Sequence, residues 1–257
     1  MASRAQILPT PMTGNGGFFL WSALVMTIFI IAGFSTQFAA GRSTFAAPLL
    51  VHLHAIVFMG WVAIYLAQNV FVATGRTAIH RRLGWVGAGW IVLMVILGCA
   101  VTAAMVRAGR VPFFFRPQQF LIFDPVTLLA FAGLTVAAIR RRRATDWHRR
   151  LHLCAMTILL APAFGRLLPM PLLAPLAFET AYVVPLLFPL AGVLADLRRE
   201  GRVHSAWGWG IGAIVSTLIA VEIVTYSPAG DAIYAAVTSG TPGAAVPGRT
   251  FPPLPPL

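Results

Sequence analysis

The sequence predicts an all-α polytopic membrane protein, a bundle of seven transmembrane helices with its N-terminus inside the cell and its C-terminus outside. Three observations support this fold class: the composition, the number of long apolar runs and the distribution of the arginines. Hydrophobic residues make up 58% of the 257 residues and charged residues only 10%, whereas roughly 25% of residues are charged in soluble domains. Lipid is therefore the expected solvent, and the chain has room for about seven helices of some 20 residues with short loops, which leaves no space for a separate soluble domain.

Seven apolar runs are long enough to serve as transmembrane helices, because a helix needs about 20 residues to cross a ~30 Å hydrocarbon core. The chain accordingly divides into a cytoplasmic N-terminal segment (1–17), a seven-helix transmembrane domain (18–226) and a tail (227–257). The tail is rich in Gly, Ala and Pro and is expected to be an extended, polyproline-like segment on the outer (periplasmic) side. The seven predicted spans are 18–38, 50–74, 83–106, 122–139, 151–168, 178–194 and 207–226.

The spans carry further local signals in chain order. The first run exceeds the 7–15 residues of a signal-peptide core and is expected to be a retained helix. The fourth span is expected to start at Asp124-Pro125, where a carboxylate can accept from free backbone N–H groups and a proline suits the first helical position. The fifth and sixth spans contain prolines that remove backbone donors and kink or end helices, namely Pro162, Pro169, Pro171, Pro175, Pro185 and Pro189.

The arginines predict the orientation, because positively charged loops stay on the cytoplasmic side of a membrane. All 19 basic residues are Arg; thirteen lie in the N-terminal segment and the loops on its side, and five on the opposite side. This distribution favours a bacterial-type inner (cytoplasmic) membrane with the N-terminus inside. The net charge of +12 does not indicate nucleic-acid binding, because these arginines lie in inter-helix loops rather than on one folded basic face.

With this orientation, ionisable residues from several spans share one depth near the outer surface. Such groups are costly in lipid, and they usually face the bundle interior or a water-filled cavity, which makes the layer a candidate functional site. Two imidazoles and three carboxylates also suit a first-row metal. The candidate metal ligands are His52, His54, Asp124, Glu179 and Glu222, and Arg166 lies at the same depth.

One face of the second span carries a regular stripe of polar and aromatic side chains. His54, Phe58, Trp61, Tyr65 and Gln68 follow one another at intervals of four, three, four and three residues, which places them on one side of a helix. Such a stripe is usually packing, but a buried His and Gln need partners. The candidate cofactor-binding residues are His54, Trp61, Gln68, Asp124, Arg166 and Glu222, and the expected ligand is a metal ion, a haem or a quinone.

Simpler roles are open for the same acidic residues. Asp124 is explained as a helix cap, and Glu179 lies where the positive end of a helix dipole favours a negative charge. Glu222 is explained equally by an ion pair with Arg166 near the interface.

A second group of histidines lies at the inner ends of the spans. His148 and His152 are four residues apart and suit one metal or one haem edge, with His80 nearby. The flanking arginines instead favour contact with lipid phosphates. A b-type haem also needs two axial ligands at equal depth on facing helices, whereas His52 and His54 share one helix.

Several of these motifs together resemble a group of bacterial polytopic membrane proteins of unknown function. The motifs are His54-x-x-x-Phe58-x-x-Trp61, Gln68, the run His80-Arg-Arg-Leu-Gly, Asp124-Pro125, and the run His148-Arg-Arg-Leu before Arg166. The resemblance covers roughly residues 50–166. Distantly similar small His-containing membrane families are linked to respiratory oxidase assembly, so the resemblance implies handling of a metal or haem.

Three functions follow as hypotheses, and none of them assigns a reaction. The first is a membrane protein whose outer polar site binds a metal, haem or quinone-like ligand for redox or assembly work. The alternative is a non-catalytic accessory subunit of a larger membrane complex, which binds other subunits through its Pro-rich tail. A small transporter with kinked fifth and sixth helices is the third. In each case the expected surroundings are the lipid bilayer.

Overall fold

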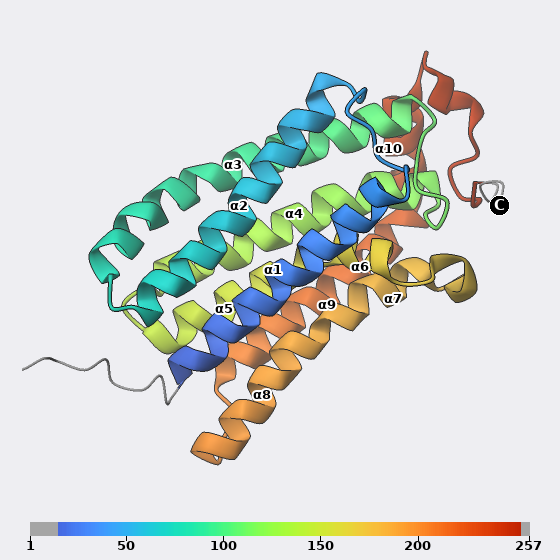
Figure 1. The fold of residues 1–257 in the computed structure, drawn as a ribbon. Helices are drawn as coiled ribbons and strands as arrows, with labels where there is room; N and C mark the ends of the chain where they lie inside the picture. Colours follow the sequence, from blue (N-terminus) through green and yellow to red (C-terminus); the bar gives the residue numbers. More distant parts are fainter. Residues whose placement is uncertain (1–14, 253–257) are drawn as a thin grey trace, which may run out of the picture.

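The computed structural model describes residues 15–252, and this part of the chain consists of helices and connecting loops (Figure 1). Six of its helical segments are long and apolar enough to cross a membrane, so the fold is that of a membrane helix bundle. Five of the six are single helices and the sixth joins three shorter ones. They are α1 (Asn15–Ala39), α2 (Leu49–Ala73), α3 (Thr77–Arg107), α4 (Pro117–Arg140) and α9 (Ser205–Thr225), and then α7 (Ala177–Val183) with η2 (Val184–Leu186) and α8 (Leu187–Glu200).

The loops define two ends of this bundle. The arginine-rich end holds the connections 74–76, 141–144 and 201–204, and the tail end holds the connection 108–116 and the residues after 225. Figure 1 shows α10 (Pro228–Thr238) at the tail end, beyond the ends of the long helices. The predicted grouping of arginine-rich loops on one side therefore appears in the fold.

The predicted fifth span (151–168) is divided into two short helices, α5 (Thr145–Ile158) and α6 (Ala161–Leu167). At the break the amides of Leu159 and Leu160 donate to carbonyls only three residues earlier, at 3.1 and 3.2 Å. Pro162 has no N–H to continue the ladder, which explains the interruption. α5 packs against α4 and α9, and α6 packs against α1, so both pieces lie within the bundle.

Small residues allow these helices to approach closely. A Cβ atom added to Gly210 of α9 would lie 2.3 Å from the Cys154 sulfur of α5, and one added to Gly192 of α8 would lie 2.2 Å from the Trp207 ring. Contacts this short mean that a side chain at either glycine would force a neighbouring group to move. Cys154 is fully buried and packs as a small core residue.

The prediction that Asp124 caps the fourth span is wrong. α4 begins two turns earlier, at Pro117, with Arg116 at the N-cap position, and Pro125 lies inside the helix. Pro117 supplies the favourable first-position proline, and the following residues through Phe123 are buried in the core. Asp124 is therefore an intrahelical acid whose side chain needs a partner on another helix.

The prediction of an extended tail is also wrong for the part of the tail that the structure describes. Residues 228–238 form α10, and a short 3₁₀ helix, η3 (Pro242–Ala245), follows. The hydroxyl of Tyr234 in α10 donates to the carbonyls of Gly243 and Val246. The backbone N–H of Gln118 in α4 donates to the carbonyl of Gly248 at 2.9 Å. The tail thus folds back onto the bundle; residues 253–257 lie outside the described part.

Candidate functional site

Three helices meet closely in the half of the bundle nearer the tail end. A Cβ atom added to Gly98 of α3 would lie 2.3 Å from Cδ1 of Leu128 in α4 and 3.3 Å from Cζ of Phe58 in α2. The absent side chain at Gly98 lets α2 and α4 pack on the same point of α3. This apolar layer fixes the position of the residues one helical turn farther toward the tail end.

That next turn carries His54 on α2, Thr102 on α3 and Asp124 on α4, each four residues from its counterpart in the apolar layer. Thr102 donates its hydroxyl to Oδ2 of Asp124 at 2.6 Å. The ring of His54 stacks on Phe58, with centroids 4.1 Å apart. We call these three residues the histidine–aspartate site.

The histidine–aspartate site holds a polar atom without a protein partner. Nδ1 of His54 is buried and forms no hydrogen bond, which is costly unless water or a ligand satisfies it. The side chains of His54, Asp124 and nearby Cys99 are nevertheless only half-buried. The site therefore contains one ring nitrogen without a hydrogen-bond partner, and other side chains of the protein cover the site only in part.

The positive charge of Arg166 in α6 acts on this site. It interacts electrostatically with both His54 and Asp124. Its guanidinium donates to the carbonyl of Pro162 at 2.7 Å and lies over the ring of Phe34, 4.3 Å from the centroid. Arg166 is thus held by its own helix, and no direct ion pair with Asp124 is formed.

The other three predicted cofactor-binding residues lie elsewhere. Trp61 is buried in the core against Phe131, with ring centroids 5.1 Å apart. Gln68 lies two turns nearer the arginine-rich end, beside Gly84. Glu222 accepts a hydrogen bond from Nε2 of Gln119 at 2.8 Å. The predicted set therefore splits, and only His54, Asp124 and Arg166 belong to one neighbourhood.

The five predicted metal ligands do not form a metal site. Among residues 15–252, no three His, Cys, Asp or Glu side chains gather in a way that could hold a metal ion. A ring nitrogen of His52 lies 3.1 Å from the carbonyl of Phe45, because this histidine faces away from His54 on α2. Glu179 does lie in the first turn of α7, as predicted.

The histidines at the arginine-rich end gather more closely than their spacing indicated. The rings of His80 and His148 are 6.1 Å apart, and those of His148 and His152 are 4.6 Å apart. Nδ1 of His148 lies 2.9 Å from the carbonyl of Ala138, within hydrogen-bonding distance, and Nδ1 of His80 is buried without a partner. The two His-Arg-Arg-Leu runs thus meet in space at the starts of α3 and α5.

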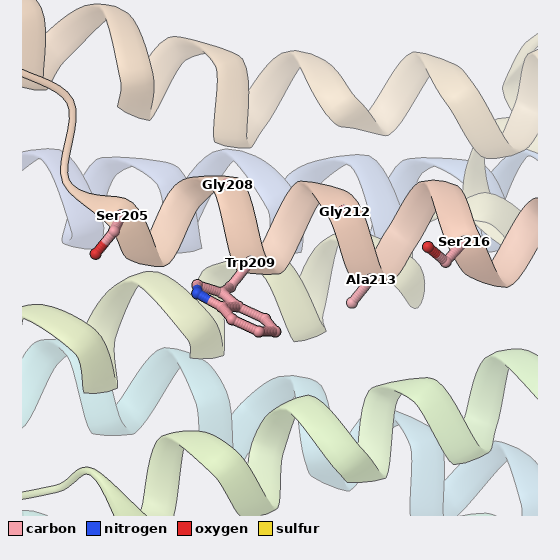
Figure 2. Close-up of a pocket in the computed structure, with 6 residues that line it drawn as sticks. All are labelled: Ser205, Gly208, Trp209, Gly212, Ala213 and Ser216. Carbon is pink, nitrogen blue, oxygen red and sulfur yellow. The ribbon is translucent and has the colours of Figure 1, made fainter.

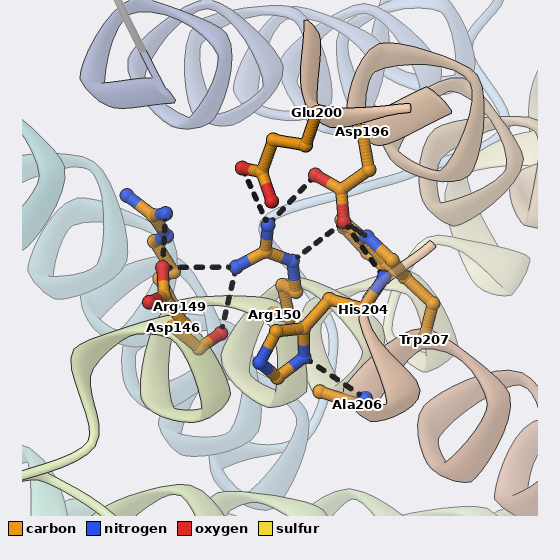
Figure 3. Close-up of polar contacts among 8 residues, drawn as sticks. All are labelled: Asp146, Arg149, Arg150, Asp196, Glu200, His204, Ala206 and Trp207. Atoms are coloured by element: carbon orange, nitrogen blue, oxygen red, sulfur yellow. Dashed lines mark hydrogen bonds and ion pairs between the residues drawn. The ribbon is translucent and has the colours of Figure 1, made fainter. Parts of the chain in front are cut away.

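A buried ion pair at the same end was missed in the sequence (Figure 3). Arg150 of α5 is 1% exposed and binds the carboxylate of Asp196 in α8 through two nitrogens. Asp196 also accepts from the indole N–H of Trp207 at 2.8 Å, and Arg150 donates to Asp146. Asp146 and Arg150 are four residues apart, a spacing typical of helical ion pairs, but the link to Asp196 depends on tertiary packing.

A hollow along one face of α9 has no ionisable side chain in its lining. It has a volume of about 630 Å³. Figure 2 shows its small lining residues and the projecting Trp209 ring on α9. The lining contains no acidic residue and no histidine, and it consists of Ser205, Gly208, Trp209, Gly212, Ala213 and Ser216.

Comparison with known proteins adds no assignment to this geometry. No protein-family model, no curated protein and no solved structure matches the chain. The function is therefore argued from the site alone.

Proposed function

We propose that the chain is a multi-pass protein of a bacterial inner membrane whose histidine–aspartate site binds a quinone-like ligand for redox or assembly work. The observation that carries this proposal is the unpaired Nδ1 of His54, in the same helical layer as the Thr102–Asp124 hydrogen bond. The two carbonyl oxygens of a quinone head group accept hydrogen bonds, and an imidazole N–H and a protonated carboxyl group are suitable donors for them.

The proposed topology has seven crossings with the arginine-rich end in the cytoplasm. Six crossings correspond to the long apolar segments, and α5 with α6 makes the seventh, since together they cover 145–167. Discontinuous helices are tolerated at membrane depth where neighbouring helices surround them. The positive-inside rule then places the N-terminus in the cytoplasm and the tail in the periplasm.

The position of the site suits a ligand that arrives from the membrane. His54 and Asp124 are half-buried although both lie within spanning helices. Neighbouring residues of α2 present apolar side chains outward, with Ile56 65% exposed. Hydrophobic surface with a few fixed polar groups is the usual character of a site for an apolar ligand with a polar head.

A haem or a metal ion fits these residues less well. A haem with two histidine ligands needs a second imidazole opposite His54, whereas His52 is on the same helix and faces Phe45. The remaining histidines, from His80 onward, belong to the arginine-rich end. A metal would find one imidazole and one carboxylate here, fewer than the three or four protein ligands of common sites.

The alternative of an accessory subunit now depends on the last residues of the tail, 253–257, which lie outside the described part of the chain. The tail was expected to reach out to other subunits, but residues 228–252 fold onto the tail end of this chain. Binding of other subunits elsewhere on the chain would involve its apolar outer surface, and every protein in lipid exposes such a surface.

Direct binding to purified protein tests the proposal. Equilibrium dialysis with a short-chain ubiquinone analogue is expected to give saturable binding to the wild type. His54→Ala should weaken this binding at least about tenfold, equivalent to about 1.4 kcal/mol, because it removes the unpaired nitrogen. His52→Ala, on the same helix but facing away, is the matched control and should bind normally.

Two outcomes would overturn the proposal. One is equal binding, or none, in the wild type and His54→Ala. The other is purified protein with a Soret band or a stoichiometric metal that is lost in His54→Ala, because that result would assign the site to haem or metal instead.

A further inference from the structure

A second polar cluster lies at the tail end, between the start of α4 and the end of α9. Gln119 of α4 is completely buried and donates from Nε2 to Oε1 of Glu222 in α9 at 2.8 Å. Its own Oε1 is buried and has no hydrogen-bond partner. Reversing this amide would place its oxygen against the Glu222 carboxylate, so the free oxygen is the expected arrangement.

Thr225, one turn after Glu222 on α9, also keeps a free oxygen. It is completely buried, and its hydroxyl forms no hydrogen bond. Other buried helical threonines of the described chain, such as Thr135 and Thr157, donate to the carbonyl four residues earlier. Residues three apart share a helix face, so Thr225 lies on the same side of α9 as Glu222.

Glu179 of α7 brings a second carboxylate to this cluster. Its Oε2 is buried without a hydrogen-bond partner, and it interacts electrostatically with Glu222 and with Arg116. Arg116 lies over the ring of Phe251, 4.2 Å from the centroid. Within residues 15–252 neither glutamate forms an ion pair with Arg116 within 4.0 Å.

Three of the four side chains, those of Gln119, Glu179 and Thr225, keep a buried oxygen without a hydrogen-bond partner. The fourth, Glu222, contributes a carboxylate whose Oε1 accepts from Gln119. Two carboxylates, an amide oxygen and a hydroxyl oxygen are the ligand types that hard cations prefer. Buried acceptors without donors are costly in an apolar setting, and two nearby carboxylates repel each other. A bound cation would remove both costs, and the single charge of Arg116 leaves the pair with a net negative charge.

From this arrangement we infer that Glu179, Glu222, Gln119 and Thr225 form a binding site for a hard cation with oxygen ligands, such as Na⁺ or Ca²⁺. Both glutamates are half-buried and lie near the loops of the tail end. The cation therefore enters from the aqueous phase at that end. Its effect is to hold the ends of α4, α7 and α9 together, independently of the histidine–aspartate site.

Cation-dependent stability of the full-length protein in detergent tests this site. Thermal unfolding should be followed during separate titrations with NaCl, CaCl₂ and MgCl₂, with choline chloride keeping the ionic strength constant. A saturable rise in the melting temperature is expected for Na⁺ or Ca²⁺, because a ligand that binds only the folded state stabilises it by mass action. Equilibrium dialysis with radioactive ²²Na⁺ or ⁴⁵Ca²⁺ provides a direct binding measurement.

Substitutions then locate the cation. Glu222→Gln and Glu179→Gln should abolish the saturable rise, and Thr225→Val, which keeps the side-chain shape, should weaken binding at least about tenfold. Asp231→Asn is the charge-matched control, because it removes a carboxylate at the same end that is not one of the proposed ligands. It loosens the attachment of the tail to Gln118 but should keep the saturable response to the cation. If Glu222→Gln does not fold, Thr225→Val and the dialysis measurement decide.

Three results would overturn the inference. The first is a rise in melting temperature with Na⁺ or Ca²⁺ that is no larger than with choline. The second is a cation-dependent rise that persists in both Glu→Gln variants. The third is stabilisation by acid alone, which would mean that the carboxylates share a proton instead of a cation.

Discussion

The guanidinium of Arg150 in α5 donates two hydrogen bonds to the carboxylate of Asp196 in α8, at 3.0 Å through Nε and 2.7 Å through Nη2. Both side chains are almost completely buried. Arg150→Met therefore leaves Asp196 buried without its cation and should lower the free energy of unfolding by about 3–5 kcal/mol. Unfolding of the purified protein in mixed detergent micelles measures this change.

Two further variants separate the lost charge pair from a loss of packing. Arg143→Met, at an exposed arginine of the 141–144 loop, should change stability by less than about 0.5 kcal/mol. The double variant Arg150→Met with Asp196→Leu should recover part of the loss, because no unpaired buried charge remains. If Arg150→Met and Arg143→Met were equally stable, the role assigned to the ion pair would be contradicted.

Gly210 and Gly208 lie on different faces of α9 and provide a matched test of its packing. A Cβ at Gly210 would meet the Cys154 sulfur at 2.3 Å, whereas one at Gly208 would meet nothing within 4 Å. Gly210→Ala should destabilise the protein by about 1–3 kcal/mol, and Gly208→Ala should be neutral or stabilising because alanine favours helix. Melting temperatures that fall equally in both variants would show that the α5–α9 contact is wrongly placed.

The sequence predicted the membrane class, most helix positions and part of the site, for identifiable reasons. Composition and apolar run length decide the class, and the spacing of His54, Phe58, Trp61 and Tyr65 correctly indicated one face of α2. The tail helix could also have been predicted, because Ser227, Pro228 and Asp231 form an N-terminal helix signature. The apparent proline-rich composition of the segment obscured it.

Other features could not be predicted, because they depend on packing between distant segments. The Asp124-Pro125 pair reads as a helix start, and only the burial of α4 from Pro117 onward shows that it is internal. Asp196 pairs with a residue 46 positions away. The unpaired oxygens of Gln119 and Thr225 could not be predicted either, because most buried glutamine and threonine side chains find hydrogen-bond partners within the protein.

The proposed topology predicts which residues a membrane-impermeant thiol reagent can reach in intact cells. In a background with Cys99 and Cys154 changed to Ala, Thr250→Cys at the tail end should react in intact bacteria. Arg143→Cys, in the arginine-rich loop, should react only after permeabilisation, because the proposed topology has that loop in the cytoplasm. The reverse pattern would contradict the orientation, and labelling of both positions would contradict an odd number of crossings.

Asp231 predicts an acid-sensitive attachment of the tail. Its hydrogen bond from Gln118, and then that from Arg249, hold the pKa of its carboxyl below the usual value, which is about 4. Because the pKa of Asp231 is lowered in the folded state, its ionised carboxylate stabilises the folded tail at pH values above the usual pKa. This stabilisation is lost as the pH falls through the lowered pKa. The attachment is therefore expected to be intact at neutral pH and to weaken only in acid.

Hydrogen exchange of residues 240–250 measures this attachment. Asp231→Asn should lower the protection factors, that is, the exchange rates of an unfolded peptide relative to those measured at the same pH, already at neutral pH, and should remove the difference in protection between neutral and acidic conditions. Protection in the wild type that is unchanged down to pH 2, or unaffected by Asp231→Asn, would contradict the assigned role.

Photolabelling with a quinone tests the central claim most directly, because it reports where such a ligand binds. The purified full-length protein should be irradiated with an azidoquinone and the labelled peptides identified by mass spectrometry, with excess unlabelled quinone as competitor. Labelling that the competitor removes is predicted in α2 around His54 and in the segments of α3 and α4 that contain Thr102 and Asp124. Competed labelling confined to the α9 hollow between Ser205 and Ser216, or labelling that His54→Ala does not reduce, would contradict the account.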